Sequence, residues 1–351
     1  MASKRKRTEM STDLANSLRD QGKYAEAEPL YREALEGRRR ELGDAHPDTL
    51  ASIFELAASL EKQGKYAEAE KLDREALDGY RRELGNAHPS TLDSIFNLAN
   101  SLCHQGKYAE AEKLYREALD GSRRVLGDAH RDTLGSINNL ANSLHHQGKY
   151  AEAEPLYREA LDCHRRELGD AHRDTLASIN NLAALLMDQG KYAEAEKLYR
   201  EALDGKRRKL GDAHPSTLDS INNLAVLLHK KGKYADAEAL FREALDGSRR
   251  ELGDAHRDTL DSINNLADSL MDQGKYADAE PLYREALDGC RRELGDAHAL
   301  TLIVINNLAN SLRKQAEIKL AEAERLTGKE QLDGTAVNAL MLLAKEGASS
   351  L

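Results

Sequence analysis

The chain has 351 residues, a net charge of −10, no tryptophan and three phenylalanines, and charged residues make up 32% of it. Nucleic acid and anionic membranes repel negative charge, so an acidic chain of this kind is a poor match for either. Abundant Ala, Leu, Glu, Lys and Arg are typical of exposed amphipathic helices, so we expect an all-α protein whose partners are proteins or peptides.

The cysteines and the amino terminus bear on the cellular compartment. Cys103, Cys163 and Cys290 are an odd number at irregular spacing, so we predict free thiols in a reducing compartment. There is no signal-peptide core and no run of about 20 apolar residues, which favours a soluble cytoplasmic protein. The basic run Lys4–Arg7 has two interpretations, a tail that solvates the first helix and a nuclear address, of which we favour the first.

One octapeptide, Gln-Gly-Lys-Tyr-Ala-Glu-Ala-Glu, recurs through the chain with minor variation. Its glycine is found at Gly22, Gly64, Gly106, Gly148, Gly190, Gly232 and Gly274. The spacing is 42 residues each time, which indicates that one supersecondary unit has been copied and stacked. Any candidate site must therefore be judged as a feature that recurs in each copy.

The copy around Gly232 shows what the unit is. Before the glycine, apolar residues recur at the spacing of an amphipathic helix: Ile221, Leu224, Ala225 and Leu228. A second such stripe follows it: Ala237, Leu240, Phe241, Ala244 and Leu245. Glycine accepts the left-handed backbone that ends a helix, so the unit is predicted to be a helical hairpin. After a Gly-Asp-Ala-His connector, Asp or Ser together with Thr is expected to cap the next helix.

Three regions are predicted, because the ends of the chain depart from the repeat. Residues 1–7 form a basic tail, residues 8–315 hold seven 42-residue hairpins and the first helix of a degenerate eighth, and residues 316–351 hold divergent capping helices and a tail. Ser11 replaces the isoleucine of the other copies, a polar change expected of a capping repeat that faces water. After Gln315 the glycine stop is lost, so we expect an altered or fused last hairpin.

The order Leu-Ala, Gly-Lys-Tyr, Ala, aromatic residue and Ala-Leu resembles the tetratricopeptide pattern. The 42-residue period and the Gly-Asp-Ala-His-Pro connector are similar to the kinesin light chain variety, over about residues 8–315. This resemblance implies a right-handed superhelical solenoid, with the first helices on its concave side and a cargo-holding function. No long heptad region precedes the repeats, so binding of a motor heavy chain does not follow from the resemblance.

The outward face of the first helices carries rows of asparagine. If Leu224 and Leu228 are buried, the helical period places Asn222 and Asn223 on the opposite face. One row comprises Asn97, Asn139, Asn181, Asn223, Asn265 and Asn307; a second comprises Asn138, Asn180, Asn222, Asn264 and Asn306; a third includes Asn16, Asn100, Asn142 and Asn310. A side-chain amide both donates and accepts, so we predict that these rows bind the backbone of an extended peptide. The alternative is structural, with each asparagine bonded to the adjacent helix.

A further row on the same face changes at every copy and includes His145, Met187 and His229. Its members are expected either to contact successive parts of a ligand or to face water. Phe54 and Phe96 are expected either to hold a ligand side chain or to pack against a neighbouring helix. Acids outnumber bases along this face, so a basic or neutral peptide would meet less repulsion.

No pattern for catalysis or cofactor binding stands out. One histidine recurs in each connector, a whole repeat from the next, so turn or capping roles are favoured over metal binding. The Gly-Lys pairs lack a phosphate-binding loop, and no Ser or Cys lies in a nucleophile motif. We therefore predict a non-enzymatic scaffold or adaptor without cofactor or metal, monomeric or weakly self-associating. The alternative is a structural array that assembles through its end helices.

Overall fold

The computed structural model describes residues 2–327, which form fifteen α-helices and no strand. Consecutive helices pair as hairpins in which the odd-numbered helix comes first, so the predicted all-α hairpin array is confirmed. The helices fall into two compact units that divide after Gly169.

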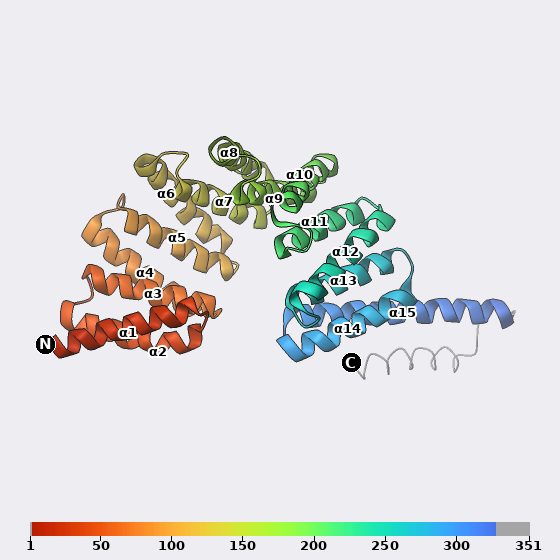
Figure 1. Ribbon diagram of the computed structural model, residues 1–351, viewed down its shortest axis with the longest axis horizontal. Helices are drawn as coiled ribbons and strands as arrows, with labels where there is room; N and C mark the ends of the chain where they lie inside the picture. The colour runs from red at the N-terminus through yellow and green to blue at the C-terminus, as the bar shows by residue number, and fades with distance from the viewer. Residues whose placement is uncertain (1, 328–351) are drawn as a thin grey trace. The chain divides into compact units, whose positions relative to one another are not determined.

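The first unit consists of four hairpins, and each of its helices packs against the next one along the chain (Figure 1). Its helices are α1 (Ala2–Asp20), α2 (Tyr24–Leu42), α3 (Pro47–Lys62), α4 (Tyr66–Leu84), α5 (Pro89–His104), α6 (Tyr108–Leu126), α7 (Arg131–His146) and α8 (Tyr150–Leu168). The repeat length in sequence thus corresponds to one hairpin with its two turns.

The second unit has three hairpins followed by one long helix that packs on the last of them (Figure 1). Its helices are α9 (Arg173–Asp188), α10 (Tyr192–Leu210), α11 (Pro215–Lys230), α12 (Tyr234–Leu252), α13 (Arg257–Asp272), α14 (Tyr276–Leu294) and α15 (Ala299–Thr327). The same hairpin geometry therefore recurs in both units.

Glycine ends the first helix of each hairpin. In α1 the N–H of Gly22 donates to the carbonyl of Arg19 at 2.8 Å, and the N–H of Lys23 donates to the carbonyl of Leu18 at 2.9 Å. Gly22 has a φ of 75°, a left-handed conformation that costs glycine little. This Schellman motif turns the chain directly into α2.

Histidine, and not the predicted Asp, Ser or Thr, caps the first helix of each following hairpin. Nδ1 of His214 accepts a hydrogen bond from the N–H of Ser216 at 3.1 Å, ahead of α11. The Thr217 hydroxyl donates to the carbonyl of Gly211 at 2.8 Å and so ties down the connector. The same histidine bond recurs at His46, His88, His130, His172, His256 and His298. The predicted capping role of the connector histidines is confirmed.

The two helices of a hairpin approach closely at a glycine of the second helix. A Cβ placed on Gly205 of α10 would lie 2.7 Å from Leu176 Cδ2 of α9. Glycine there lets the helices meet, so that Ile179, Leu182 and Ala195 are buried between them. Each large apolar side chain buried in this way contributes about 1.5–3 kcal/mol to folding.

The amino-terminal end differs from the prediction. Helix α1 begins at Ala2, so residues 2–7 belong to the helix and do not form a tail before it. Ser11 does not face water, since it is buried and donates a hydrogen bond to Glu33 Oε2 at 3.3 Å. The open face of α1 instead exposes Met10 and Leu14, which are 63% and 54% exposed.

At the other end, α15 runs without a break through the position where the glycine stop is lost. Without that glycine no residue favours the left-handed turn, so residues 316–327 extend the first helix of the eighth copy. The last hairpin is therefore fused in this region. The capping helices and tail that we predict for residues 328–351 lie outside the described residues.

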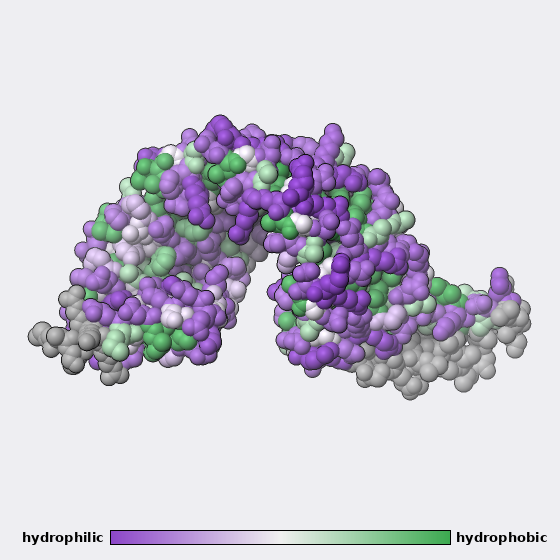
Figure 2. Space-filling model, viewed as in Figure 1, coloured by the Kyte–Doolittle hydropathy of each residue, from purple (hydrophilic) through white to green (hydrophobic). Residues whose placement is uncertain are grey.

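Hydrophilic residues cover most of the face shown in Figure 2, and hydrophobic ones occur in small groups. Within residues 2–327 no helix is long and apolar enough to cross a membrane. The apolar stripes of the helices are instead buried between neighbouring helices.

Candidate functional site

The third predicted asparagine row serves the hairpins themselves. The Tyr115 hydroxyl of α6 donates to Asn100 Oδ1 of α5 at 2.5 Å. The same bond joins Tyr31 to Asn16 and Tyr157 to Asn142. Where α12 has Phe241, the matching position of α11 is Val226, so both partners of the bond are lost in that hairpin, whereas Tyr199 of α10 keeps its hydroxyl opposite Ala184 of α9. Asn100 and Asn142 thus have their carbonyl oxygens committed inside the hairpin, which removes them from the candidate peptide-binding set.

The second row has a divided role. Asn138, Asn180 and Asn222 are half-buried, and the Oδ1 atom of each has no hydrogen-bond partner among the described residues. The amide nitrogen of Asn222 donates to Ser262 Oγ on α13 at 3.0 Å. One end of the Asn222 amide therefore links two repeats, while its Oδ1 atom is buried and unpaired among the described residues.

Asn264 and Asn307, near the end of the array, are bonded to protein groups. Nδ2 of Asn264 donates to Asp268 Oδ2 at 3.1 Å, and Nδ2 of Asn307 donates to Asp268 Oδ1 at 2.9 Å and to Asn264 Oδ1 at 3.3 Å. Asn264 is buried. This network joins α13 to α15, so the structural alternative holds for these two positions.

The remaining members of the first row are unengaged. They are Asn97, Asn139, Asn181, Asn223 and Asn265, half-buried except for the exposed Asn223. Across residues 2–327 none of these side chains has a hydrogen-bond partner, so both ends of each amide are available. They form the part of the predicted site that the repeat packing leaves free.

The histidines of the variable row are held by neighbours. His229 Nε2 lies 2.9 Å from Asp272 Oδ2, and its ring meets Tyr234 edge-on at 5.2 Å. His145 meets the ring of Tyr150 edge-on at 5.5 Å. Met187 is half-buried. These contacts favour packing over ligand contact for both histidines.

The two phenylalanines of the first unit are half-buried on α3 and α5. Phe96 meets the ring of Tyr115 edge-on, with ring centroids 5.9 Å apart. Part of the Phe96 ring therefore packs against a neighbouring helix, in agreement with the packing interpretation.

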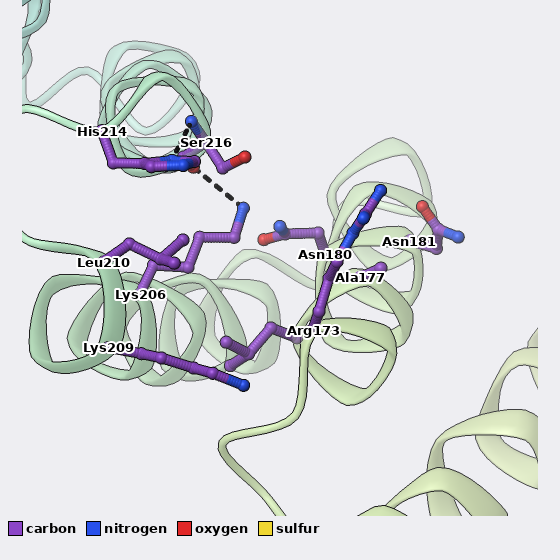
Figure 3. Close-up of a pocket in the computed structure, with 10 residues that line it drawn as sticks. Arg173, Ala177, Asn180, Asn181, Lys206, Lys209, Leu210, His214 and Ser216 are labelled. Carbon is purple, nitrogen blue, oxygen red and sulfur yellow. Dashed lines mark hydrogen bonds between the residues drawn. The ribbon is translucent and has the colours of Figure 1, made fainter. Parts of the chain in front are cut away.

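A cleft in the second unit was not predicted from the sequence. It has a volume of about 620 Å³ and lies between α9, the end of α10 and the start of α11 (Figure 3). Lys206 and Lys209 extend from α10 toward α9, where Asn180 points back toward Lys206 and Arg173 lies beside it. The signal in the sequence was Lys209, which replaces the glutamate found in five of the other six copies, together with Lys206 at a position that varies between copies.

The lysines of this cleft are anchored on backbone carbonyls. Nζ of Lys206 donates to the carbonyl of Ser216 at 3.0 Å, and Nζ of Lys209 donates to the carbonyl of Ala171 at 3.2 Å. Burial lowers the pKa of Lys206, and nearby Asp219 opposes that effect. The charge of Lys206 is therefore held partly away from water, whereas Lys209 and Arg173 are exposed.

The first unit contains a buried carboxyl at a position that is aromatic in the other second helices. Asp73 of α4 is 2% exposed, and its Oδ2 accepts a hydrogen bond from Ser101 Oγ at 2.7 Å. The Ser101 hydroxyl also lies within hydrogen-bond reach of Glu61. Burial raises the pKa of Asp73 to about 7, with Glu61 and Glu70 acting in the same direction and the Ser101 bond against it. This carboxyl is enclosed, so we assign it no role in ligand contact.

Metal and thiol chemistry find little support in the described part of the chain. No group of three or more His, Cys, Asp or Glu side chains within it could hold a metal ion. Cys103, Cys163 and Cys290 are free, and burial raises the pKa of each thiol. A raised pKa keeps a thiol protonated and therefore unreactive.

Sequence profiles described as tetratricopeptide repeat match residues 7–82, 50–124, 90–162, 132–208 and 174–250, and a second profile of that description matches residues 259–300. The chain belongs to the tetratricopeptide repeat family. A search of curated proteins finds no match. The predicted resemblance to tetratricopeptide repeats is confirmed by these profiles.

Solved structures of tetratricopeptide repeat proteins include kinesin light chain relatives. One is a variant form of a Podospora anserina protein with nearly identical repeats, described as a kinesin light chain. It is 27% identical to this chain, with a TM-score of 0.54, and the match covers 58% of this chain and 97% of that one. BtubC (BKLC) from P. vanneervenii is 24% identical with a TM-score of 0.52, over 68% of this chain and 93% of that one. A tetratricopeptide repeat protein from Parabacteroides merdae is 16% identical with a TM-score of 0.63, over 88% of this chain and 99% of that one, which shows the shared fold.

Proposed function

We propose that this tetratricopeptide repeat protein is a scaffold or adaptor that holds an extended peptide segment along its first helices, as in kinesin light chain-like cargo recognition. Its role is binding and not catalysis. The free cysteines agree with a reducing compartment such as the cytoplasm.

The observation that carries the proposal is the set of unsatisfied amide oxygens in the second row. Buried acceptors without a partner are rare in proteins, because each costs about 1–3 kcal/mol. Yet Oδ1 lacks a partner at the same position of successive repeats, in Asn138, Asn180 and Asn222. A peptide N–H would satisfy each of these atoms.

The free amides of the first row supply the complementary groups. Asn181 directly follows Asn180, and Asn223 directly follows Asn222, so these repeats place a free amide beside an unpaired oxygen. A peptide backbone presents alternating N–H and C=O groups, which this combination can pair without reading side chains. Peptide capture would therefore depend more on the ligand backbone than on its sequence.

The test uses peptides selected by display against the wild-type chain and measured by fluorescence anisotropy. Changing Asn139, Asn181, Asn223 and Asn265 to Ala should weaken binding by about 10-fold or more, because several backbone bonds are lost at about 0.5–1.5 kcal/mol each. N-methylation of alternate peptide amides should weaken binding comparably.

A matched control changes the exposed Lys71, Lys113 and Lys197 of the second helices to Ala, which should leave affinity unchanged. Circular dichroism confirms that each variant remains helical. Equal affinity of the asparagine variant and the wild type would show that the free amides do not bind the peptide.

The open face of α1 favours a second function, end-to-end assembly of the array. Met10 and Leu14 expose apolar surface on α1, the first described helix of the stack. Light scattering as a function of concentration measures this directly. A constant monomer mass would exclude assembly, and Met10→Lys with Leu14→Lys should abolish any association that is seen.

A further inference from the structure

The cleft between α9, α10 and α11 concentrates positive charge in an acidic protein. Among the residues that line it, Arg173, Lys206 and Lys209 are cationic and none is a carboxylate. The equivalent positions one repeat later include three carboxylates and no lysine or arginine: Asp219, Glu251 and Asp258. This one copy therefore differs from its neighbour in the sign of its charge, while the hairpin around it is the same.

None of the three cations is neutralised by a carboxylate in hydrogen-bond contact within residues 2–327. The two lysines donate to the carbonyls of Ser216 and Ala171, which orient the ammonium groups but leave their charge uncompensated. Asp219 acts on Lys206 only through space.

The arginine of the cleft shows the same loss of a partner. Arg257, which occupies the equivalent position two repeats later, lies 3.9 Å from the carboxylate of Asp261 one turn along its helix. In the cleft, the residue one turn after Arg173 is Ala177. The missing acid and the two lysines thus both make the charge of the cleft more positive.

Asn180 adds a requirement of the opposite kind. Its Oδ1 is buried without a hydrogen-bond partner and faces Lys206 across the cleft. A ligand that fills this space should therefore bring a hydrogen-bond donor as well as negative charge. The volume of about 620 Å³ is more than one small anion needs, so it has room for an anionic side chain with its backbone.

We propose that this cleft binds the phosphoryl group of a phosphoserine or phosphothreonine within the peptide held along the first helices. A phosphoryl group carries about −1.5 to −2 charges at pH 7 and three acceptor oxygens, so a cleft lined by cations and by no carboxylate suits it better than it suits a single carboxylate. The backbone N–H of the phosphorylated residue supplies the donor for Asn180. This inference rests on the proposed peptide-binding function and adds a preference for one modified residue.

The experiment measures fluorescence anisotropy with labelled alanine–glycine nonapeptides whose central residue is serine, phosphoserine or glutamate. The decisive variant is Lys206→Ser with Lys209→Glu, which copies Ser248 and Glu251 of the next repeat and so uses residues that the hairpin already accommodates. The wild type should bind the phosphoserine peptide about 10-fold or more tightly than either other peptide. The variant should lose this preference and keep its affinity for the serine peptide.

A charge-matched control, Lys113→Ser with Lys197→Glu, alters exposed lysines of α6 and α10 by the same total charge and should keep the preference. Inorganic phosphate should compete only weakly, since it lacks the backbone donor.

Three results would overturn the proposal: equal binding of the phosphoserine and glutamate peptides, a preference that survives in the decisive variant, or inorganic phosphate that competes as well as the phosphopeptide. Failure of the proposed peptide-binding function gives a different result. In that case the serine peptide would not bind the wild type, or its binding would not be weakened by the asparagine changes.

Discussion

Two hairpins of this array depart from the common repeat in different places. In the α3–α4 hairpin of the first unit the change lies in the core, where Asp73 replaces the usual tyrosine and Ala58 replaces the asparagine of the other three hairpins of that unit. In the α9–α10 hairpin of the second unit the added Lys206 and Lys209 line an open cleft. A change in the core must be accommodated by packing, whereas a change beside a cleft alters what can bind there.

The energetic consequences differ accordingly. Asp73 places a carboxyl where a buried tyrosine ring would otherwise fill space, and its ionisation is opposed by burial. Lys206 and Lys209 retain contact with water, so their cost to folding is small. A substitution beside a cleft can therefore change what binds there at a smaller cost to folding than a substitution in the core.

The largest expected effect comes from restoring the first of these hairpins. Asp73→Tyr together with Ala58→Asn recreates the pair formed by Tyr115 and Asn100. At pH 7 and above the variant should be more stable by several kcal/mol, since the shift from 3.8 to about 7 alone corresponds to about 4 kcal/mol. Urea unfolding followed by circular dichroism measures this.

The pH dependence of that difference follows from the sign of the shift. The folded-state pKa of Asp73 is raised, so the folded chain holds a proton that the unfolded chain has already lost. Stability of the wild type relative to the variant is therefore greatest below about pH 4 and falls as the pH rises to about 7. A difference that does not vary over this window would show that Asp73 is not enclosed.

An intermediate effect is expected from the tyrosine–asparagine pair of the first unit. Tyr115→Phe should destabilise the chain by about 1–2 kcal/mol, because Asn100 Oδ1 loses its donor. Adding Asn100→Val should recover much of the loss, as Val226 and Phe241 already form this apolar pair in the second unit. A double variant as unstable as the single one would mean that the two units do not tolerate the exchange equally. Thermal unfolding of both variants decides this.

The smallest effect is expected from ion pairs between successive second helices. Arg81 lies 2.7 Å from Glu117 in the first unit, and Arg249 lies 2.5 Å from Glu285 in the second. These side chains are partly exposed, so Arg81→Ala and Arg249→Ala should each cost less than about 1 kcal/mol, and less still in 1 M salt. Urea midpoints at low and high salt test this. A clearly unequal cost would break the equivalence of the two units in their outer packing.

Much of the fold could be predicted because its signals are local. The spacing of Ile221, Leu224 and Leu228 predicts a helix, and Gly232 predicts its end, without reference to any other part of the chain. For the connector histidines the sequence left both a turn role and a capping role possible. The capping hydrogen bond is also local, since it joins His214 to the residue two positions later. The start of α1 was misjudged, because the basic run carries no signal that separates a tail from a first helical turn.

The candidate site was predicted only in outline. The three asparagine rows share a helix face, and nothing in the sequence alone separates Asn100, which pairs with Tyr115, from Asn181, which is free. That distinction depends on side chains of the paired helix and of the next repeat. The exchange of both residues at Phe241 and Val226 hints at the structural row, but Tyr199 opposite Ala184 shows that the sequence pattern alone does not establish it.

By itself the sequence determined the repeat length, the hairpin of each copy, its glycine stops and the helix face that carries the asparagines, because these depend on residues a few positions apart. Tertiary structure alone decided which amides remain free and that Arg173, Lys206 and Lys209 line one cleft. Their side chains come from α9 and α10, and the position of Lys206 depends on a carbonyl of α11. Such a site exists only after the helices pack, since packing brings together groups that the chain separates.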